Sequence, residues 1–446
     1  MALHTALRPT SILVLAFVLM FSAAHPARAI DLLRDADMEH GLKQLAAPIL
    51  RAAGLSPNRV KILVVDNRSL NAFVVSQDAI FLHAGLISKL TSAPQLQGVI
   101  AHEAAHIANG HLTRRLTNLR TARTAAGLGV ALAAVAAAAG GGEAAAGIAL
   151  GAQSSAQRLF LKHTRAEESS ADSSAIRFMR SAGVPTSGLA EVMQVFRGQE
   201  VLAERRQDPY VRSHPLTRDR LRAIQAQSSA ATAGTDATSA YWFARVKGKL
   251  TAYQRNPKWS LNRAGETGYS DVKAIRIAVA QHRQSKTKQA LRAIDGAIKA
   301  RPKDPFLHDL KGQILLETRN FRGAINAYSQ AAKLAPRDGL ILSGLGRALL
   351  AGGQPKQALG YLEKANAIDY RDGIMLRDLA TAYAKTGQTG MAALVTSERY
   401  ALRGQLDTAG IHAKRASDLL ARGSGPWQRA QDVLSAAQRF AKQRKR

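Results

Sequence analysis

The sequence predicts an α+β chain that is mostly helical, in which a domain with a small β-sheet is followed by an α-solenoid of helical repeats. Three observations lead to this prediction. Short runs rich in β-branched residues lie between helical patterns in the first half of the chain. Small residues recur every 34 positions in the second half. The length of 446 residues leaves room for about three structural units.

Composition narrows the possible classes of protein. A hydrophobic content of 46% is ordinary for a chain that buries a core, and it excludes wholesale disorder. The 62 Lys and Arg residues against 32 Asp and Glu give a net charge of +30, which favours anionic partners such as acidic lipid headgroups, lipopolysaccharide or nucleic acid. The chain has no cysteine, which excludes a disulfide scaffold, a Cys zinc finger, a thiol protease and a lipid-modified N-terminal cysteine.

Residues 1–29 have the three parts of a signal peptide. A weakly basic start is followed by an apolar run over residues 12–21, and small residues at Ala27 and Ala29 suit a signal peptidase. The apolar run is too short to cross a hydrocarbon core of ~30 Å as a helix. An uncleaved N-terminal anchor is the alternative. We therefore expect a mature chain from Ile30 in the periplasm, where the absence of thiols suits an oxidising compartment.

The mature chain opens with elements that predict the small sheet. Residues 31–54 form one amphipathic helix in this prediction, because Leu and Ile recur at near-helical spacing and Gly54 is a suitable stop. Residues 60–65, 72–75 and 79–82 are short apolar runs separated by turn-forming residues, which is typical of strands.

An Ala/Gly-rich segment at residues 125–152 carries a single charge, Glu143. The glycines at 140–142 leave each leg too short to cross a bilayer comfortably. Arginines just upstream are expected for a segment that rests on an anionic membrane surface. A helical hairpin buried against its own domain is the equally weighted alternative.

Residues 226–238 are rich in Ala, Ser and Thr, and we interpret them as a linker or exposed loop. Beyond them, residues 239–446 repeat with a period of 34, and the small residues at one column are Ala290, Ala324, Ala358 and Ala392. This period and these small columns resemble the tetratricopeptide repeat, ending here in a basic tail. The fourth repeat departs from the pattern, since Thr396 and Arg399 stand in apolar columns. It is either a capping repeat or a shift of register.

The chemistry-bearing motif lies in a helix predicted from Ser92, its N-cap, to about Gly110. His102 and His106 are four residues apart, so both imidazoles lie on one helical face and can reach a single cation. Glu103 stands beside such a cation without ligating it, as a general base must.

A catalytic zinc site needs a third protein ligand. His111 is off the metzincin register, which leaves Glu168 as the better candidate, presented by a second helix. Asp172, one turn further, can hold a ligating imidazole by its other ring nitrogen. This spacing is the glutamate-zincin pattern, so we predict a gluzincin-type metalloprotease domain over residues 30–225 with one zinc ion.

His214 is followed by Pro215, which holds it out of a helix on a loop. As a fourth protein ligand it would displace the water that attacks the substrate and would close the site. A solvated loop histidine is the alternative. For His83, His111 and His163 we expect core or surface roles.

These motifs together resemble the HtpX-like zinc metallopeptidase family, which includes the CAAX prenyl proteases, and especially its periplasmic, repeat-bearing BepA-like branch. The resemblance covers nearly the whole mature chain. It implies that His102, His106 and Glu168 bind zinc, that Glu103 is catalytic and that Asp172 supports a ligand. It also implies that a histidine in a His-Pro pair, here His214, keeps the enzyme latent. The run Asn71, Ala72 and Phe73 matches the family's Asn-Ala-Phe before the strand that borders its cleft, although the family's glycines are replaced by Ser76, Gln77 and Asp78 in the turn that follows.

The function implied is a periplasmic zinc endopeptidase that degrades misfolded or stalled outer-membrane proteins. Substrates would add to the edge strand near residues 71–75, main chain to main chain. The repeats would recruit the outer-membrane β-barrel assembly machinery, and contact with an anionic membrane surface would be peripheral. The alternative is a periplasmic chaperone or assembly scaffold with little protease activity. We expect no nucleic-acid partner, because export removes the chain from nucleic acid and no basic–aromatic binding module is visible.

Overall fold

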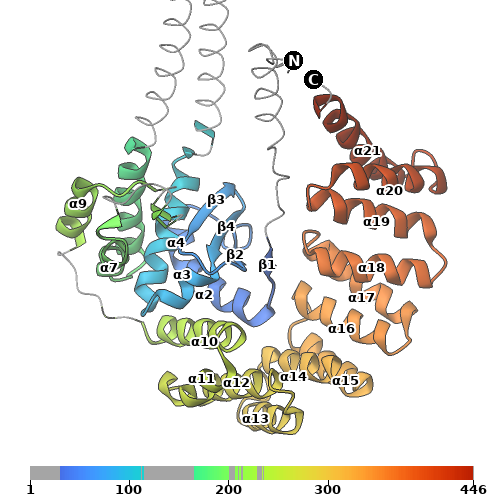
Figure 1. The fold of residues 1–446 in the computed structure, drawn as a ribbon, viewed down its shortest axis with the longest axis horizontal. Coiled ribbons are helices and arrows are strands. Elements are labelled where there is room, and N and C mark those ends of the chain that lie inside the picture. Colours follow the sequence, from blue (N-terminus) through green and yellow to red (C-terminus); the bar gives the residue numbers. More distant parts are fainter. Residues whose placement is uncertain are drawn as a thin grey trace, which may run out of the picture. The chain divides into compact units, whose positions relative to one another are not determined.

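The computed structural model confirms a mostly helical α+β chain with a small sheet and a series of helical repeats (Figure 1). The residues that it describes are 31–111, 113–114, 165–199, 206–208, 210–211, 214–228, 234 and 236–444. The predicted signal peptide and the Ala/Gly-rich segment at 125–152 lie outside them. Two compact units are present, one over residues 31–369 and one from Tyr370 onward. Across the described part of the chain, no helix has the length and apolarity needed to span a bilayer.

A four-stranded sheet lies in the first unit, with the strand order β1-β2-β4-β3. Its strands are β1 (Leu32–Leu33), β2 (Lys61–Val65), β3 (Ala72–Ser76) and β4 (Ala79–His83). β2 and β4 are parallel, while β3 is antiparallel to β4. The three strands predicted at 60–65, 72–75 and 79–82 are therefore confirmed. β3 has one neighbour only, so one of its edges is unpaired within the described sheet.

The prediction of one helix from residue 31 was wrong at its start. Leu32 pairs with Val65 as part of β1, and the helix α2 (Ala36–Ala52) begins only after Asp35. The Asp35 carboxylate accepts a hydrogen bond from the backbone N–H of Met38, which makes it the N-cap. A helical spacing of leucines could not reveal that the first two of them are used in a sheet.

The central helix of the first unit is α4 (Ala93–Ala108), as the sequence predicts. The Ser92 hydroxyl accepts from the backbone N–H of Gln95 and caps it. α4 is buried on nearly all sides, and it crosses α7 (Ser187–Val195) closely, because a Cβ on Gly98 would lie 3.0 Å from the backbone of Leu189. A short helix that was not predicted, α3 (Ala84–Lys89), leads into α4.

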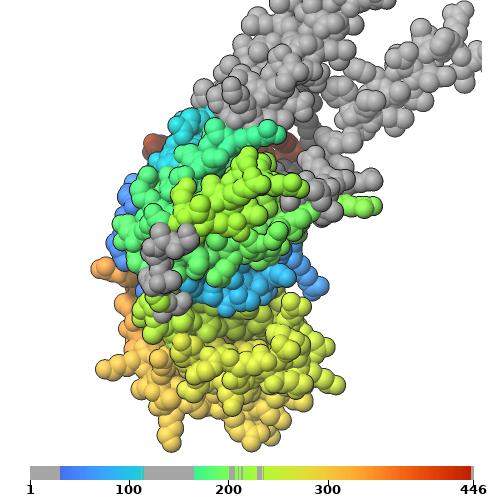
Figure 2. All heavy atoms as spheres, turned by 90° about the vertical axis from the view of Figure 1, so that its left-hand side faces the viewer, coloured from blue at the N-terminus to red at the C-terminus, as the bar shows by residue number. Residues whose placement is uncertain are grey.

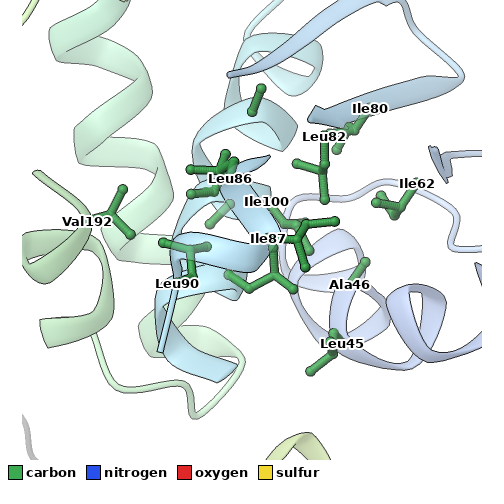
Figure 3. Packing of buried hydrophobic residues seen from close by; sticks show 14 of the residues in the cluster. Leu45, Ala46, Ile62, Ile80, Leu82, Leu86, Ile87, Leu90, Ile100 and Val192 are labelled. Carbon is green, nitrogen blue, oxygen red and sulfur yellow. The ribbon is translucent and has the colours of Figure 1, made fainter. Parts of the chain in front are cut away.

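The hydrophobic core lies between the sheet, α2, α3, α4 and α7 (Figure 3). Leu45 of α2, Ile80 of β4, Ile100 of α4 and Val192 of α7 are fully buried in it. Burial of such side chains supplies most of the stabilisation of this unit, at about 1.5–3 kcal/mol for each side chain. The core holds α4 rigidly, and with it the histidine pair.

The helix α10 (Ala237–Gln254) belongs to the same core, because Phe243, Val246 and Leu250 pack into it. Two helices overlap the predicted linker at 226–238, since α9 (Arg218–Ser228) ends inside it and α10 begins inside it. In Figure 2 the blue and green part of the chain lies directly on the yellow helices that follow α10.

Pairs of antiparallel helices follow, as the 34-residue period predicts. The first unit continues with α11 (Pro257–Asn262), η3 (Ala264–Thr267), α12 (Ser270–His282), α13 (Thr287–Ala300), α14 (Pro305–Glu317), α15 (Phe321–Leu334), α16 (Gly339–Ala351) and α17 (Pro355–Ile368). The second unit contains α18 (Gly373–Lys385), α19 (Thr389–Leu402), α20 (Leu406–Leu419) and α21 (Gly425–Arg444). The small residues that recur in each repeat let the paired helices approach closely. A Cβ on Gly312 would lie 2.7 Å from the Tyr328 ring, and one on Gly346 would lie 2.5 Å from Leu362.

A buried ionic cluster joins α2 to the first repeats. Arg245 of α10 is 1% exposed and lies 2.6 Å from Asp37 of α2 and 2.6 Å from Asp304, the N-cap of α14. Lys249, also buried, pairs with Asp35 at 2.8 Å. Burial opposes the charge on Asp37, but Arg245 and Lys249 hold its pKa below the usual value. The cluster therefore fixes the start of the repeats to the domain that carries α4.

Candidate metal centre

α4 places two imidazoles side by side in the interior. His102 and His106 are one helical turn apart, both are buried, and their Nε2 atoms lie 3.1 Å from each other. Two ring nitrogens at this distance face a common point. The predicted pair on one helical face is thus present in the fold.

The carboxylate of Glu168 reaches the same point from a second helix, over residues 165–181. Its oxygens lie 3.2 Å from His102 Nε2 and 3.4 Å from His106 Nε2, and the side chain is fully buried. The structure therefore brings together the three residues that the sequence analysis selected as ligands.

His214 completes the group from the loop before α9. Its Nδ1 lies 3.3 Å from His102 Nε2 and 3.0 Å from a Glu168 oxygen. One ligand atom from each of His102, His106, Glu168 and His214 lies within 4.8 Å of the others. Three imidazole nitrogens and a carboxylate oxygen, all buried, are a donor set that zinc accepts in tetrahedral sites.

Each histidine of the α4 pair has a second neighbour at Nδ1, the ring nitrogen that does not face the common point. The Oδ1 of Asp172 lies 3.0 Å from His102 Nδ1. The Nδ1 of His111 lies 2.9 Å from His106 Nδ1, and His111 is itself buried. Such partners orient metal-binding imidazoles and select their tautomer. The expectation of an ordinary core or surface role for His111 missed this contact, although its position five residues after His106 could have indicated it.

Arg220 is the residue of this group that the sequence analysis did not single out. Its guanidinium binds both oxygens of Asp172, at 2.7 and 2.9 Å, and lies 3.3 Å from Glu168. It also donates to the carbonyl of Pro215 at 2.7 Å. Arg220 thus connects the helix of Glu168 to the loop of His214. No local pattern distinguishes it from the other arginines of α9.

Glu103 lies beside the cluster and is fully buried. Its Oε1 is 3.4 Å from His214 Nε2. The Tyr210 ring packs against the His214 ring with 4.8 Å between centroids. A change in the position of His214 would therefore change the surroundings of the Glu103 carboxylate.

The edge strand β3 borders this group. The Ala72 carbonyl lies 3.3 Å from His214 Nε2, and the Asn71 carbonyl accepts from the backbone N–H of His83 at 2.9 Å. The Phe73 side chain points away from the group and stacks on Phe81 with 5.2 Å between ring centroids. Ala72, one of the three residues predicted at the cleft, therefore contacts the candidate ligand His214. His83 is buried and contacts Ser69, and His163 lies outside the described residues.

Burial opposes charge throughout this group, but the neighbouring charges decide the protonation states. Burial lowers the pKa of His102, yet hydrogen bonds to Asp172 and Glu168 raise it to about 10. Burial raises the pKa of Glu168, but His214 and His102 hold it well below its usual value. The pKa of Asp172 is lowered in the same way, against burial, by His102 and Arg220. The cluster therefore holds two carboxylates ionised in the interior.

Comparisons with known proteins fall on the two halves of the chain. Residues 33–228 match the family described as peptidase family M48. Residues 244–344 match a tetratricopeptide repeat-like domain, and residues 315–383 match a tetratricopeptide repeat.

One curated relative is named "Putative beta-barrel assembly-enhancing protease", from Vibrio cholerae serotype O1. It is 28% identical over 225 residues, which cover 44% of this chain and 46% of the relative. This chain thus matches less than half of that relative's length. Among solved structures, MamA from Desulfovibrio magneticus is 16% identical over 37% of this chain and 96% of its own, with a TM-score of 0.32. Another MamA structure is 15% identical over 37% of this chain and 97% of its own, with a TM-score of 0.31.

Proposed function

Because residues 33–228 match peptidase family M48 and the residues after them match tetratricopeptide repeats, we propose that this chain is a zinc-dependent endopeptidase of the periplasm. Its substrates are misfolded or stalled outer-membrane proteins. The observation that carries the proposal is the convergence of His102, His106, Glu168 and His214 within 4.8 Å of one another, beside the buried Glu103.

In this proposal His102, His106 and Glu168 hold the zinc ion. When bound, zinc supplies a Lewis acid that polarises the scissile carbonyl and lowers the pKa of water. The Glu103 carboxylate accepts the proton of the attacking water and later delivers it to the leaving amine. Asp172 and His111 keep the two imidazoles in the orientation that presents Nε2 to the ion. Burial of all these groups excludes bulk water from their charges.

Substrate binding is assigned to β3. In the described sheet no strand pairs with the outer edge of β3, so an extended segment can add to the sheet there without a tight requirement for particular side chains. Proteins that have failed to fold expose such segments, whereas folded barrels have no free strand edge. The His214 contact with the Ala72 carbonyl links this edge to the metal ligands.

His214 keeps the enzyme latent in this proposal, because its Nδ1 faces the same point as the three ligands. We expect the His214→Ala variant to retain zinc and to degrade an unfolded β-barrel protein faster than the wild type. His308→Ala, on α14 of the repeats, is the matched control and should match the wild type. Slower degradation by His214→Ala with zinc retained would show instead that His214 takes part in catalysis.

Zinc dependence tests the proposed activity directly. We expect the purified mature chain to contain a single zinc ion, to lose proteolysis on treatment with a chelator and to regain it on addition of zinc. Metal analysis and a protease assay measure these quantities. Zinc content near zero in active protein, or activity indifferent to the chelator, would contradict the proposal.

Zinc binding to the metal-free protein should release protons. His102, with a pKa of about 10, carries a proton at pH 7 and must lose it to become a ligand. The affinity for zinc should therefore fall as the pH is lowered. Calorimetric titration in two buffers of different ionisation enthalpy measures the protons released. Identical observed enthalpies in the two buffers would mean that no proton is exchanged.

Recruitment to the β-barrel assembly machinery is proposed for the repeats, since stacked helical pairs form extended binding surfaces. The name of the Vibrio relative, with its reference to β-barrel assembly, supports this partner. A periplasmic chaperone or assembly scaffold is the second candidate function, because a site closed by His214 is equally suited to a protein that binds without cleaving. A Glu103→Gln variant that remains fully functional in cells would favour the scaffold.

A further inference from the structure

The two residues that interrupt the repeat pattern, Thr396 and Arg399, line a hollow in the second unit. The hollow has a volume of about 560 Å³ and lies between α18, α19 and α20. Its ionisable side chains are four cations and a histidine, namely Arg377, Lys385, Arg399, Arg415 and His412. Among the residues that the structure describes, no carboxylate lines it. An anion would therefore be attracted to this surface.

The hollow exists because the fourth repeat has no large side chain at a position where the preceding repeats have one. In an earlier repeat the ring of Tyr328 packs against Gly312 so closely that a Cβ there would lie 2.7 Å away. The corresponding residues of the fourth repeat are Thr396 and Ala380. Both line the hollow, since a threonine is too small to fill the space that a tyrosine occupies.

At the second position where the fourth repeat departs from the pattern, a charged side chain replaces a small one. Ala297, Ala331 and Ala365 occupy it in the preceding repeats, and all three are buried. Arg399 occupies it in the fourth repeat, where it is partly exposed and lines the hollow. The two residues by which the fourth repeat departs from the repeat pattern thus line one and the same hollow.

One of the four cations of the hollow, Arg377, is neutralised by an acid of its own helix. Glu398 is engaged by Arg429 of α21 at 2.6 Å, and Arg377 pairs with the adjacent Asp378 at 2.9 Å. Within the described residues no ion pair with a carboxylate is formed by Lys385, Arg399 or Arg415. Three cationic groups therefore remain available to a ligand.

We propose that this hollow binds an acidic peptide segment in an extended conformation. Guanidinium groups bind carboxylates with two parallel hydrogen bonds, which Arg399 and Arg415 can offer. Alanines at 380, 384 and 392 also line the hollow and let a main chain approach closely. A planar membrane surface fits less well, because it cannot enter a space between three helices. The proposal does not depend on proteolysis, since all of its residues lie in the second unit.

Binding of a labelled oligoglutamate peptide to the full mature chain tests the proposal, with fluorescence anisotropy as the readout and oligoglutamine as the uncharged probe. We expect oligoglutamate alone to bind, and increasing salt to weaken it. The triple variant Lys385→Gln, Arg399→Gln and Arg415→Gln should bind it about tenfold or more weakly. The matched control replaces three exposed cations of the same unit outside the hollow: Arg403→Gln, Arg422→Gln and Arg439→Gln. It should retain the affinity of the wild type.

A filling variant separates loss of the site from loss of the fold. Thr396→Leu restores an apolar side chain to the column, so it should abolish peptide binding while the thermal unfolding temperature stays equal or rises. Equal weakening by both triple variants would overturn the proposal, because it would show binding to net charge alone. Binding to vesicles of an anionic phospholipid without binding to oligoglutamate would overturn it in favour of a membrane surface.

Discussion

Replacing Glu103 by glutamine is expected to reduce proteolysis by about 10²–10⁴-fold, the contribution of a positioned general base. Glutamine has nearly the same shape as glutamate, so the packing around this fully buried side chain should be preserved. The amide cannot accept the proton of the attacking water. Zinc content should stay unchanged, because the proposed ligands His102, His106 and Glu168 are intact.

The measurement is best made in the His214→Ala background, where the proposed latency cannot hide the loss. Glu167→Gln is the matched control, since Glu167 is also buried and precedes Glu168 on the same helix. It has no assigned role and should leave the rate of degradation nearly unchanged. Full activity of the Glu103→Gln variant with zinc bound would remove Glu103 from the mechanism.

Replacing Arg245 by methionine should lower the free energy of unfolding by about 3–5 kcal/mol, the usual cost of removing one partner of a buried ion pair. Methionine fills part of the space but leaves the carboxylates of Asp37 and Asp304 without the guanidinium that now lies 2.6 Å from each. Urea unfolding at neutral pH measures the change. Arg292→Met, at an exposed position of α13, should change stability by about 0.5 kcal/mol or less.

A double-mutant cycle identifies the ion pair as the cause. The variant with both Asp37→Asn and Arg245→Met removes both charges, so its loss of stability should be clearly smaller than the sum of the two single losses. Strictly additive losses would mean that Arg245 does not stabilise the unit through its pair with Asp37. The cycle also tests whether α10 is held to α2 by charge.

Much of the fold was predictable because it depends on local patterns. The Ser92 cap, the short apolar runs of the strands and the 34-residue period can all be recognised in the sequence, and the structure confirms each of them. Leu32 and Leu33 show the limit of such patterns. Their spacing suits a helix, but pairing with Val64 and Val65, more than thirty residues away, makes them a strand.

The residues of the candidate site also divide into those that local patterns predict and those that they do not. His102 and His106 were predictable because the helical repeat places residues four apart on one face. Arg220 was not predictable, because its importance comes from contacts with Asp172, 48 residues earlier in the chain, and with Glu168. The role of His111 behind His106 likewise depends on how the chain turns after α4.

Local sequence patterns were enough to predict the residue types of a metal centre, the helix that carries two of them and the period of the repeats, because each follows from the geometry of a single helix or of one repeat. Tertiary packing sets the contacts of Glu168 and His214 with the α4 pair, the place of β3 at the edge of the sheet and the inclusion of α10 in the core. These features join segments far apart in the chain. Their positions are set by the packing of the whole unit, which no local pattern encodes.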